Sequence, residues 1–302
     1  VSCIITYIVQ QKGGAVVDFE NITLRMRVEN AVVSYAAYVF KMLWPAQLAV
    51  LYTYTAHSVL KVLVSFSLLL LLTAACVCFG RRYRFLAVGW LWYLGTLVPV
   101  IGLVQVGQQS MADRYTYMPF TGLFMAAAYS IKEFVCGRRE KKMVLALTAL
   151  IVIGFWPLMT LRQVRYWKDS ITLFKHTLAV TENNYAIHTN YITSLNTLGR
   201  YADVVEESEK FLKNKPDSIE VLNNIGIALG QMGRVDEAAE YFRKAIHCCP
   251  QNPLAYFNLA TVLLIQNKPQ EAAEVYKQLL QIDPNNAEAQ MKINEIMRKS
   301  TQ

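Results

Sequence analysis

A repeating pattern with a period of about 34 residues, near the C-terminus, constrains the fold of this chain more than any other feature of the sequence. Small and large apolar residues recur within it at the spacing of two helices, and a proline follows the second helix because it cannot continue one. Small residues fit where helices cross closely, and large ones fill the space between them. The clearest period, residues 219–252, has Leu222, Ile225, Gly226, Leu229, Ala238, Phe242, Ala245 and Pro250.

This period is that of the tetratricopeptide repeat (TPR), an α-solenoid built from pairs of helices. We expect three repeats, at residues 185–218, 219–252 and 253–286, the first of them degenerate. Residues 287–300 are expected to form the capping helix that an open stack requires. The segment 167–181 has the spacing of a single second TPR helix, so the expected solenoid occupies residues 167–302.

Three asparagines, Asn190, Asn224 and Asn258, are each one period apart and so occupy the same place on the first helix of each repeat. That place is expected to face the inside of the superhelix. A side-chain amide both donates and accepts hydrogen bonds, so the three residues are candidates to bind a peptide backbone of any sequence. The alternative is that Asn is simply common at this position of TPR repeats.

The first half of the chain contains apolar segments long enough to cross a bilayer. A hydrocarbon core of about 30 Å requires roughly 20 apolar residues in a helix. The third predicted span is the weakest, because Lys132 and Glu133 lie near its end. The fold class is therefore all-α, with a multi-pass transmembrane part at residues 1–166 before the solenoid. Its predicted spans are 59–79, 85–106, 117–136 and 143–161.

The segment 31–55 is also apolar, but it contains Lys41 and a central Pro45. A spanning helix broken by proline is one interpretation. An interfacial or re-entrant helix is the one we favour, because Val1–Val9, if it leads outward, must connect to residue 59 on one side of the membrane.

Two short basic loops, at residues 80–84 and 137–142, predict the orientation of the chain. Loops rich in Lys and Arg stay in the cytoplasm. Residues 105–116 and the whole solenoid are then expected outside it, in the periplasm of a bacterium or the ER lumen of a eukaryote.

Charge is distributed unevenly. Residues 1–166 contain 16 Lys and Arg against 6 Asp and Glu, whereas residues 167–302 contain 14 against 16. A basic excess beside apolar segments indicates membrane topology, and the second half has no basic stripe for nucleic acid. None of the six cysteines forms a CxxC pair and no His lies at metal-ligand spacing, so we expect no metal site and no bound cofactor.

The segment 88–119 carries the strongest resemblance to a known family. It reads Gly-Trp-Leu-Trp-Tyr-Leu-Gly-Thr-Leu-Val-Pro-Val-Ile-Gly at 89–102 and Met-Ala-Asp-Arg-Tyr-Thr-Tyr-Met-Pro at 111–119, and the segments 11–16 and 30–35 also fit. With the repeats that follow, the chain resembles the transmembrane and tetratricopeptide-repeat (TMTC) family and fits its bacterial relatives best. The eukaryotic members are regarded as protein O-mannosyltransferases of the GT-C fold. The resemblance therefore implies a polyprenyl-phosphate sugar as donor and a protein acceptor bound by the repeats.

The chain departs from this family in one respect. GT-C enzymes carry acidic catalytic residues in their first extracytoplasmic loop, and no such loop is present here. The chain begins at Val1 without a signal peptide, so we expect it to be the C-terminal part of a longer protein whose catalytic residues lie upstream. The acidic residues of the first half are Asp18, Glu20, Glu29, Asp113, Glu133 and Glu140.

The sequence Asp113-Arg114-Tyr115, followed by Tyr117, is the candidate donor-phosphate site. The planar guanidinium of Arg114 can donate two parallel hydrogen bonds to a phosphate, and the tyrosine hydroxyls can add more. The structural alternative is that Asp113 caps the following helix, and that Arg114 pairs with Asp113 or with lipid phosphate.

The sequence is compatible with two functions. The first is the C-terminal part of a membrane glycosyltransferase that transfers a sugar from a polyprenyl-phosphate donor to a protein held by the repeats. The second is a membrane-anchored TPR scaffold without chemistry, since TPR repeats by themselves indicate only that a protein or peptide is bound.

Overall fold

The computed structural model describes residues 23–103, 109–135 and 139–300, which form two compact units divided after Asn184. Predictions that concern Cys3, Val1–Val9, the segment 11–16, Gln105 and Cys136 lie outside these residues. The first unit contains α2 (Leu24–Leu43), β1 (Tyr52–Thr53), α3 (Val59–Gly80), α4 (Arg84–Leu97), β2 (Gln109–Met111), η2 (Asp113–Thr116), α5 (Tyr117–Val135), α6 (Arg139–Tyr166) and α7 (Ser170–Val180).

Helices α4 and α5 cross with their backbones in contact, and two glycines make this possible. A Cβ atom added at Gly122 would lie 2.6 Å from the carbonyl oxygen of Gly89, and one added at Gly89 would meet the carbonyl oxygen of Gly122. Neither position has room for a side chain. Crossings of this kind, with small residues at the contact, are typical of helices packed in membranes.

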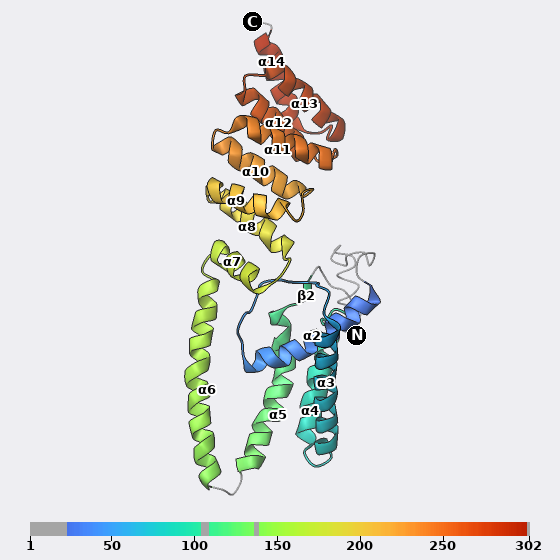
Figure 1. Cartoon of the computed structure of the whole chain (residues 1–302), viewed down its shortest axis with the longest axis vertical. Coiled ribbons are helices and arrows are strands. Elements are labelled where there is room, and N and C mark those ends of the chain that lie inside the picture. Colours follow the sequence, from blue (N-terminus) through green and yellow to red (C-terminus); the bar gives the residue numbers. More distant parts are fainter. Residues whose placement is uncertain (1–22, 104–108, 136–138, 301–302) are drawn as a thin grey trace. The chain divides into compact units, whose positions relative to one another are not determined.

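Helix α2 is fixed to the rest of the first unit by tyrosines. The hydroxyl of Tyr35 donates to the carbonyl of Leu94 over 2.8 Å, and that of the fully buried Tyr93 donates to the carbonyl of Tyr35. The hydroxyl of Tyr38 donates to the carbonyl of Ala112 and accepts from its N–H. Helix α2 runs across the direction of α6 (Figure 1).

Several predicted spans differ from the helices observed. The helix expected over 85–106 ends at Leu97, and the backbone turns at Val98–Val100, where Pro99 has no N–H to continue the helical hydrogen bonds. Helix α2 starts before the segment 31–55 and ends at Leu43, ahead of Pro45. Among the described residues, one helix, α3, is long and apolar enough to cross a membrane, and 6% of its most apolar stretch is buried.

Residues 44–55 form a strap that α6 and α7 hold through side chains. The Nε2 atoms of His176 and Gln163 lie 3.1 and 3.3 Å from the carbonyl oxygen of Leu48, and the amide of Asn184 donates to that of Leu51 over 2.8 Å. The ring of His176 stacks on Tyr166. These contacts place α7 in the first unit, whereas the sequence led us to expect the solenoid from residue 167.

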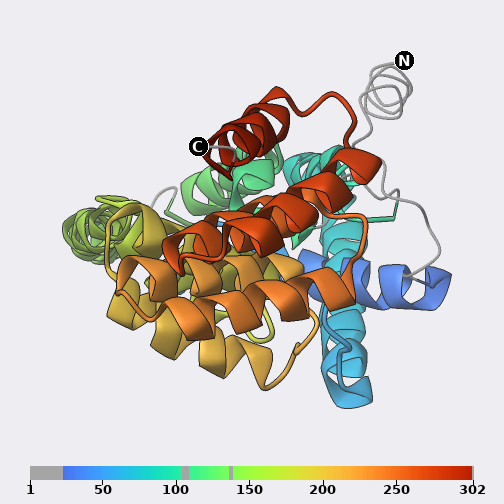
Figure 2. The same cartoon turned by 90° about the horizontal axis from the view of Figure 1, so that it is seen from above.

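The second unit is a stack of helix pairs, seen from two directions in Figures 1 and 2. The turn within each pair needs a left-handed residue, and Gly199, Gly233 and Asn267, at equivalent positions of the three repeats, supply it with φ of 72°, 78° and 61°. Its helices are α8 (Tyr185–Thr197), α9 (Tyr201–Leu212), α10 (Ile219–Gln231), α11 (Val235–Cys248), α12 (Pro253–Ile265), α13 (Pro269–Ile282) and α14 (Ala287–Ser300).

Close helix crossings in this unit follow the pattern of small residues in the sequence. A Cβ atom added at Gly226 would lie 2.7 Å from the ring of Phe242, so the glycine lets α10 and α11 approach. Ala238, Phe242 and Ala245 are buried in the contact, at the positions where the repeat pattern predicts them.

Candidate functional site: a lysine-lined pocket and the repeat face

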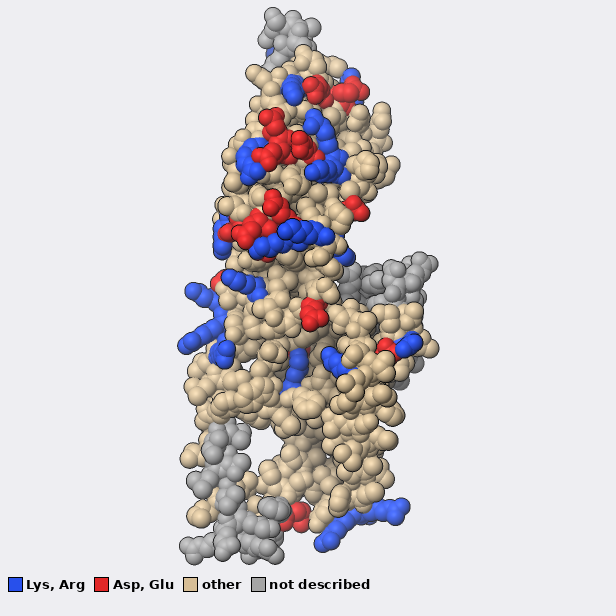
Figure 3. Space-filling view, viewed as in Figure 1, with Lys and Arg blue, Asp and Glu red and all other residues tan. Residues whose placement is uncertain are grey.

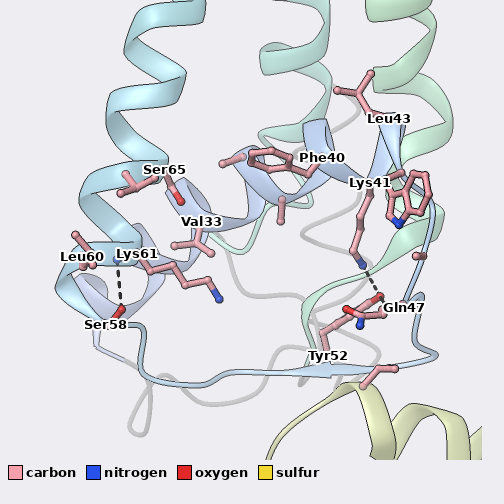
Figure 4. A pocket seen from close by; sticks show the side chains of 16 residues that line it. Val33, Phe40, Lys41, Leu43, Gln47, Tyr52, Ser58, Leu60, Lys61 and Ser65 are labelled. Carbon is pink, nitrogen blue, oxygen red and sulfur yellow. Dashed lines mark hydrogen bonds between the residues drawn. The ribbon is translucent and has the colours of Figure 1, made fainter.

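The first unit contains an open pocket of about 910 Å³ between α2, the strap and the start of α3 (Figure 4). Apolar side chains make up most of its wall. Two lysines, Lys41 and Lys61, enter it from α2 and α3 (Figure 4). The wall includes Val33, Phe40, Leu43, Trp44, Leu60 and Val64.

The charge of Lys41 is compensated inside the protein. Its Nζ donates to Oδ1 of Asp113 over 2.8 Å and to the hydroxyl of Tyr52, which itself donates to Oδ2 of Asp113 over 2.8 Å. The side chains of Lys41 and Asp113 are 17% and 25% exposed. Burial lowers the pKa of Lys41, and the Asp113 charge opposes that shift. Burial, followed by the same carboxylate, raises the pKa of Tyr52.

Lys61 is the lysine of the pocket that keeps an uncompensated charge. Its side chain is exposed, and no carboxylate of the described residues lies within ion-pair distance. Burial, and then the Lys61 charge, lower the pKa of the neighbouring His57. As far as the described residues show, the pocket therefore combines one unpaired cation with an apolar wall, an arrangement that suits an amphiphile with an anionic head.

The four candidate donor-phosphate residues are not brought together. The carboxylate of Asp113 points to Lys41 and Tyr52 and so does not cap α5, which follows the short helix η2. Arg114 is exposed and lies over the ring of Tyr115, 5.4 Å from its centroid, and no ion pair joins it to Asp113. The hydroxyl of Tyr115 accepts from Gln109, and Tyr117 is 80% exposed.

Sequence reasoning missed Lys41, Tyr52 and Lys61 as site residues. The available signal was the occurrence of lysines within apolar segments, where a charge is costly and is generally retained for a purpose. In the described part of the chain, no group of three His, Cys, Asp or Glu side chains is placed to hold a metal ion.

The second unit presents a regular surface on the first helix of each repeat, which we call the repeat face. Apart from Glu220 and His188, which pairs with Glu207, helices α8, α10 and α12 contain no acidic, basic or His side chain. The face consists of three rows, each with one member per repeat: Asn190, Asn224 and Asn258; Thr193, Ile227 and Thr261; and Thr197, Gln231 and Ile265.

The three asparagines of the repeat face have different surroundings. Asn190 is exposed. The amide of Asn224 is used within the protein, because its Nδ2 donates to Oγ1 of Thr193 over 3.1 Å and its Oδ1 accepts from Asn196. The Nδ2 of Asn258 is buried and has no hydrogen-bond partner.

The family model described as tetratricopeptide repeat matches residues 192–253 and 223–287. The second unit therefore contains TPR repeats, a module that binds proteins and peptides. No curated protein sequence matches the chain.

Solved structures with similar helical repeats include MamA, with 21% identity, a TM-score of 0.42 and coverage of 46% of this chain and 82% of that one. The first TPR domain of Spaghetti (RPAP3), bound to an HSP90 peptide, has 18% identity and a TM-score of 0.38 over 39% of this chain and 96% of its own. The Yersinia enterocolitica chaperone SycD has 15% identity and a TM-score of 0.38 over 41% and 98%. The match to the family model, and not these similarities, identifies the repeats.

Proposed function

We propose that this protein is a membrane-anchored interaction module whose repeat face binds an extended, uncharged segment of a partner protein. The observation that carries the proposal is the uncharged chemistry of the face: an asparagine recurs once per repeat on the first helix of each pair, and the other two rows consist of threonine, glutamine and isoleucine. A surface that repeats along a solenoid fits an extended chain, which also repeats along its length. Asn190, exposed on α8, lies at the beginning of this face.

The distribution of charged residues in the second unit supports an uncharged partner segment. Most acidic and basic residues of the repeats lie on the second helices, α9, α11 and α13, or in the turns. Charges of both signs lie side by side on the surface of Figure 3. The repeat face has no cluster of Lys or Arg to hold an acidic peptide or a nucleic acid. Desolvating a charged peptide against such a face would cost free energy without a compensating partner.

The test is a selection of random peptides, displayed on phage, against the whole chain in detergent. We expect the selected peptides to lack charge and to bind equally well at low and high salt. Replacing Thr197, Gln231 and Ile265 by Glu should abolish binding. The matched control replaces Glu206, Glu240 and Glu274, which recur with the same period on the second helices, by Gln. Selection of acidic peptides, or equal binding by both triple variants, would refute the proposal.

The first unit is proposed to be a multi-pass membrane anchor with the repeats outside the cytoplasm, in the periplasm or the ER lumen. Exposed apolar side chains of α3 support this, since a bilayer would cover them. So does the position of Arg81, Arg82 and Arg84, at the end of the unit where α3 meets α4 and opposite α7 (Figure 1). A reporter fused after Gln302 should be active only outside the cytoplasm, and activity inside would reverse the orientation.

A second candidate is transfer of a sugar from a polyprenyl-phosphate donor to the protein that the repeats hold. The pocket favours it, because Lys61 could pair with the phosphate while the apolar wall contacts the isoprenoid chain. The described residues do not favour catalysis by this chain alone. Both oxygens of the Asp113 carboxylate accept hydrogen bonds from Lys41 and Tyr52, so this carboxylate is not free to act as a base.

Transfer is tested with radiolabelled polyprenyl-phosphate mannose and an acceptor peptide from the selection. If the pocket holds the phosphate, Lys61→Ala should weaken donor binding, and Arg114→Ala should leave it unchanged. The opposite result would indicate that the phosphate binds at Arg114, Tyr115 and Tyr117 instead. Absence of transfer and of donor binding would leave the interaction module as the function.

A further inference from the structure

The lysine-lined pocket adjoins a second hollow of about 330 Å³, which lies between α2, the two short strands and the end of α7. The two hollows share wall residues on α2, the strap, α3 and α7, namely Val33, Ala37, Tyr52, Lys61 and Val180. We call the two hollows together the α2–α3 groove. Lys61 stands where its two parts meet, and the inference drawn from it rests on the membrane anchor proposed above.

The two parts of the α2–α3 groove differ in chemistry. The larger part is mostly apolar and open at the surface, since Phe40, Leu43 and Leu60 in its wall are 62%, 61% and 72% exposed. The smaller part is lined mainly by hydroxyl and amide side chains, which are those of Asn30, Ser34, Thr53, Thr55, Ser110 and Thr181. A ligand that matches both parts has an apolar end and a hydroxylated end.

The charge at the junction indicates what joins the two ends. Among the described residues, no carboxylate lies within ion-pair distance of Lys61, whereas Lys41 is paired with Asp113. The neighbouring His57 adds no second charge at neutral pH, because burial and then the Lys61 charge lower its pKa. One unpaired cation matches a phosphodiester, which has a single negative charge, better than a phosphomonoester, which has nearly two.

The position of Lys61 along α3 is that of a lipid phosphate. It lies in the first turn of the helix, directly before the long apolar stretch that could cross a bilayer. The edge of such a stretch lies at the boundary between hydrocarbon and headgroups, and a lysine there extends its amine to the headgroups. Basic pockets between helices at this level bind anionic lipid heads.

We propose that the α2–α3 groove holds one anionic phospholipid of the bilayer, with its phosphate at Lys61. Its uncharged, hydroxylated head occupies the smaller part, and its acyl chains lie along the apolar side chains of α2 and α3. Phosphatidylglycerol has this chemistry. A choline or ethanolamine head would instead bring a second cation close to Lys61. The bound lipid bridges α2 and α3 and thereby stabilises the first unit.

The test measures lipid retention by native mass spectrometry of the whole chain in detergent. The probes are phosphatidylglycerol and phosphatidylcholine with identical acyl chains. We expect the parent to prefer phosphatidylglycerol by about fivefold, the value of one lysine beside an anionic head, and to melt at a higher temperature in its presence. Lys61→Ala should abolish both effects, and Lys61→Arg should keep them. Lys175→Ala, which removes an exposed lysine of α7 outside the groove, is the matched control and should behave as the parent.

A second variant tests the place of binding without changing any charge. Ala37 lines both parts of the groove, so Ala37→Phe should fill the junction and prevent retention of phosphatidylglycerol while Lys61 is intact. Ala127→Phe, at an exposed alanine of α5, adds the same ring elsewhere and should retain the lipid. This comparison decides the matter even if Lys61→Ala fails to fold.

The remaining outcomes separate this inference from the membrane anchor. Equal retention of the two lipids by the parent, or a preference that survives both Lys61→Ala and Ala37→Phe, would overturn the inference and leave the anchor in place. Stronger retention of polyprenyl-phosphate mannose than of phosphatidylglycerol would overturn it too, and would assign the groove to the sugar donor. A first unit that is monodisperse without detergent would refute the anchor and this inference with it.

Discussion

Helices α3 and α12 are both strongly apolar, but α12 buries most of its apolar side chains and α3 exposes most of its own. In α12 the buried residues are Ala255, Tyr256, Leu259, Ala260, Val262 and Leu263, covered by neighbouring repeats. In α3 the buried residues are Ser65 and Gly80, and the leucines, valines and phenylalanines mostly face outward. The apolar surface of α12 is buried by the protein itself, whereas that of α3 is not covered by the described residues. Composition alone does not separate the two cases.

The two units also differ in what their glycines contact at close helix crossings. Gly89 and Gly122 face one another's backbone carbonyls, so neither contact can relax by a side-chain movement. Gly226 faces the ring of Phe242, which a small rotation can displace. The crossing of α4 and α5 therefore depends on a contact between backbones, and that of α10 and α11 on the packing of a side chain.

Separating the units should produce the largest effect. We expect residues 185–302 alone to be soluble and helical by circular dichroism, because three repeats with a cap suffice for a stack. We expect residues 23–184 to require detergent. Aggregation of the repeats without detergent, or a monodisperse first unit in buffer, would remove the contrast between α3 and α12.

Adding one methyl group at a glycine contact should have the next largest effect. Gly89→Ala should destabilise the first unit by about 3 kcal/mol, because the new Cβ meets a backbone oxygen that cannot move aside. Thermal unfolding in detergent measures the change. Gly95→Ala on the same helix, where a Cβ meets nothing within 4 Å, is the control and should not destabilise. Similar melting of both variants would contradict the glycine crossing.

The same methyl group in the second unit should cost less. Gly226→Ala is expected to destabilise the solenoid by about 1 kcal/mol, since the ring of Phe242 can shift and Ala favours the helix. Gly226→Leu should be worse, at roughly 1–3 kcal/mol, because the ring cannot clear four added carbons. A melting temperature above that of the parent for Gly226→Leu would show that α10 and α11 do not cross at this residue.

The last comparison is between an ion pair in each unit, and it includes the variant with the smallest expected effect, Glu237→Gln. Asp113→Asn should cost about 1–2 kcal/mol, because it leaves the largely buried Lys41 without its counter-charge. Glu237→Gln, which removes the exposed pair with Arg234, should leave the melting temperature unchanged, since solvent screens such pairs. Equal effects would mean that burial does not distinguish the two pairs.

The sequence predicts the repeat unit well and the first unit only in part. The helix pairs, the buried Ala238 and Phe242 and the close approach at Gly226 all follow from the repeat pattern. The end of α4 at Leu97 was not predicted, because the apolar run continues through Pro99 without a change of composition. The roles of the candidate donor-phosphate residues and of the asparagines remain proposals. The sequence pattern predicts where these residues lie, but it does not predict which groups they contact.

By itself, the sequence determined the solenoid, because each repeat packs only on its neighbours and a local pattern therefore contains most of the information needed. Tertiary structure alone decided that Lys41 meets Asp113, 72 residues away, and that the strap is held by His176 and Asn184. Those contacts join segments with no common period, so no spacing rule relates them. They depend on how α2, the strap and α7 pack, and a contact between distant segments forms only once the whole unit has folded.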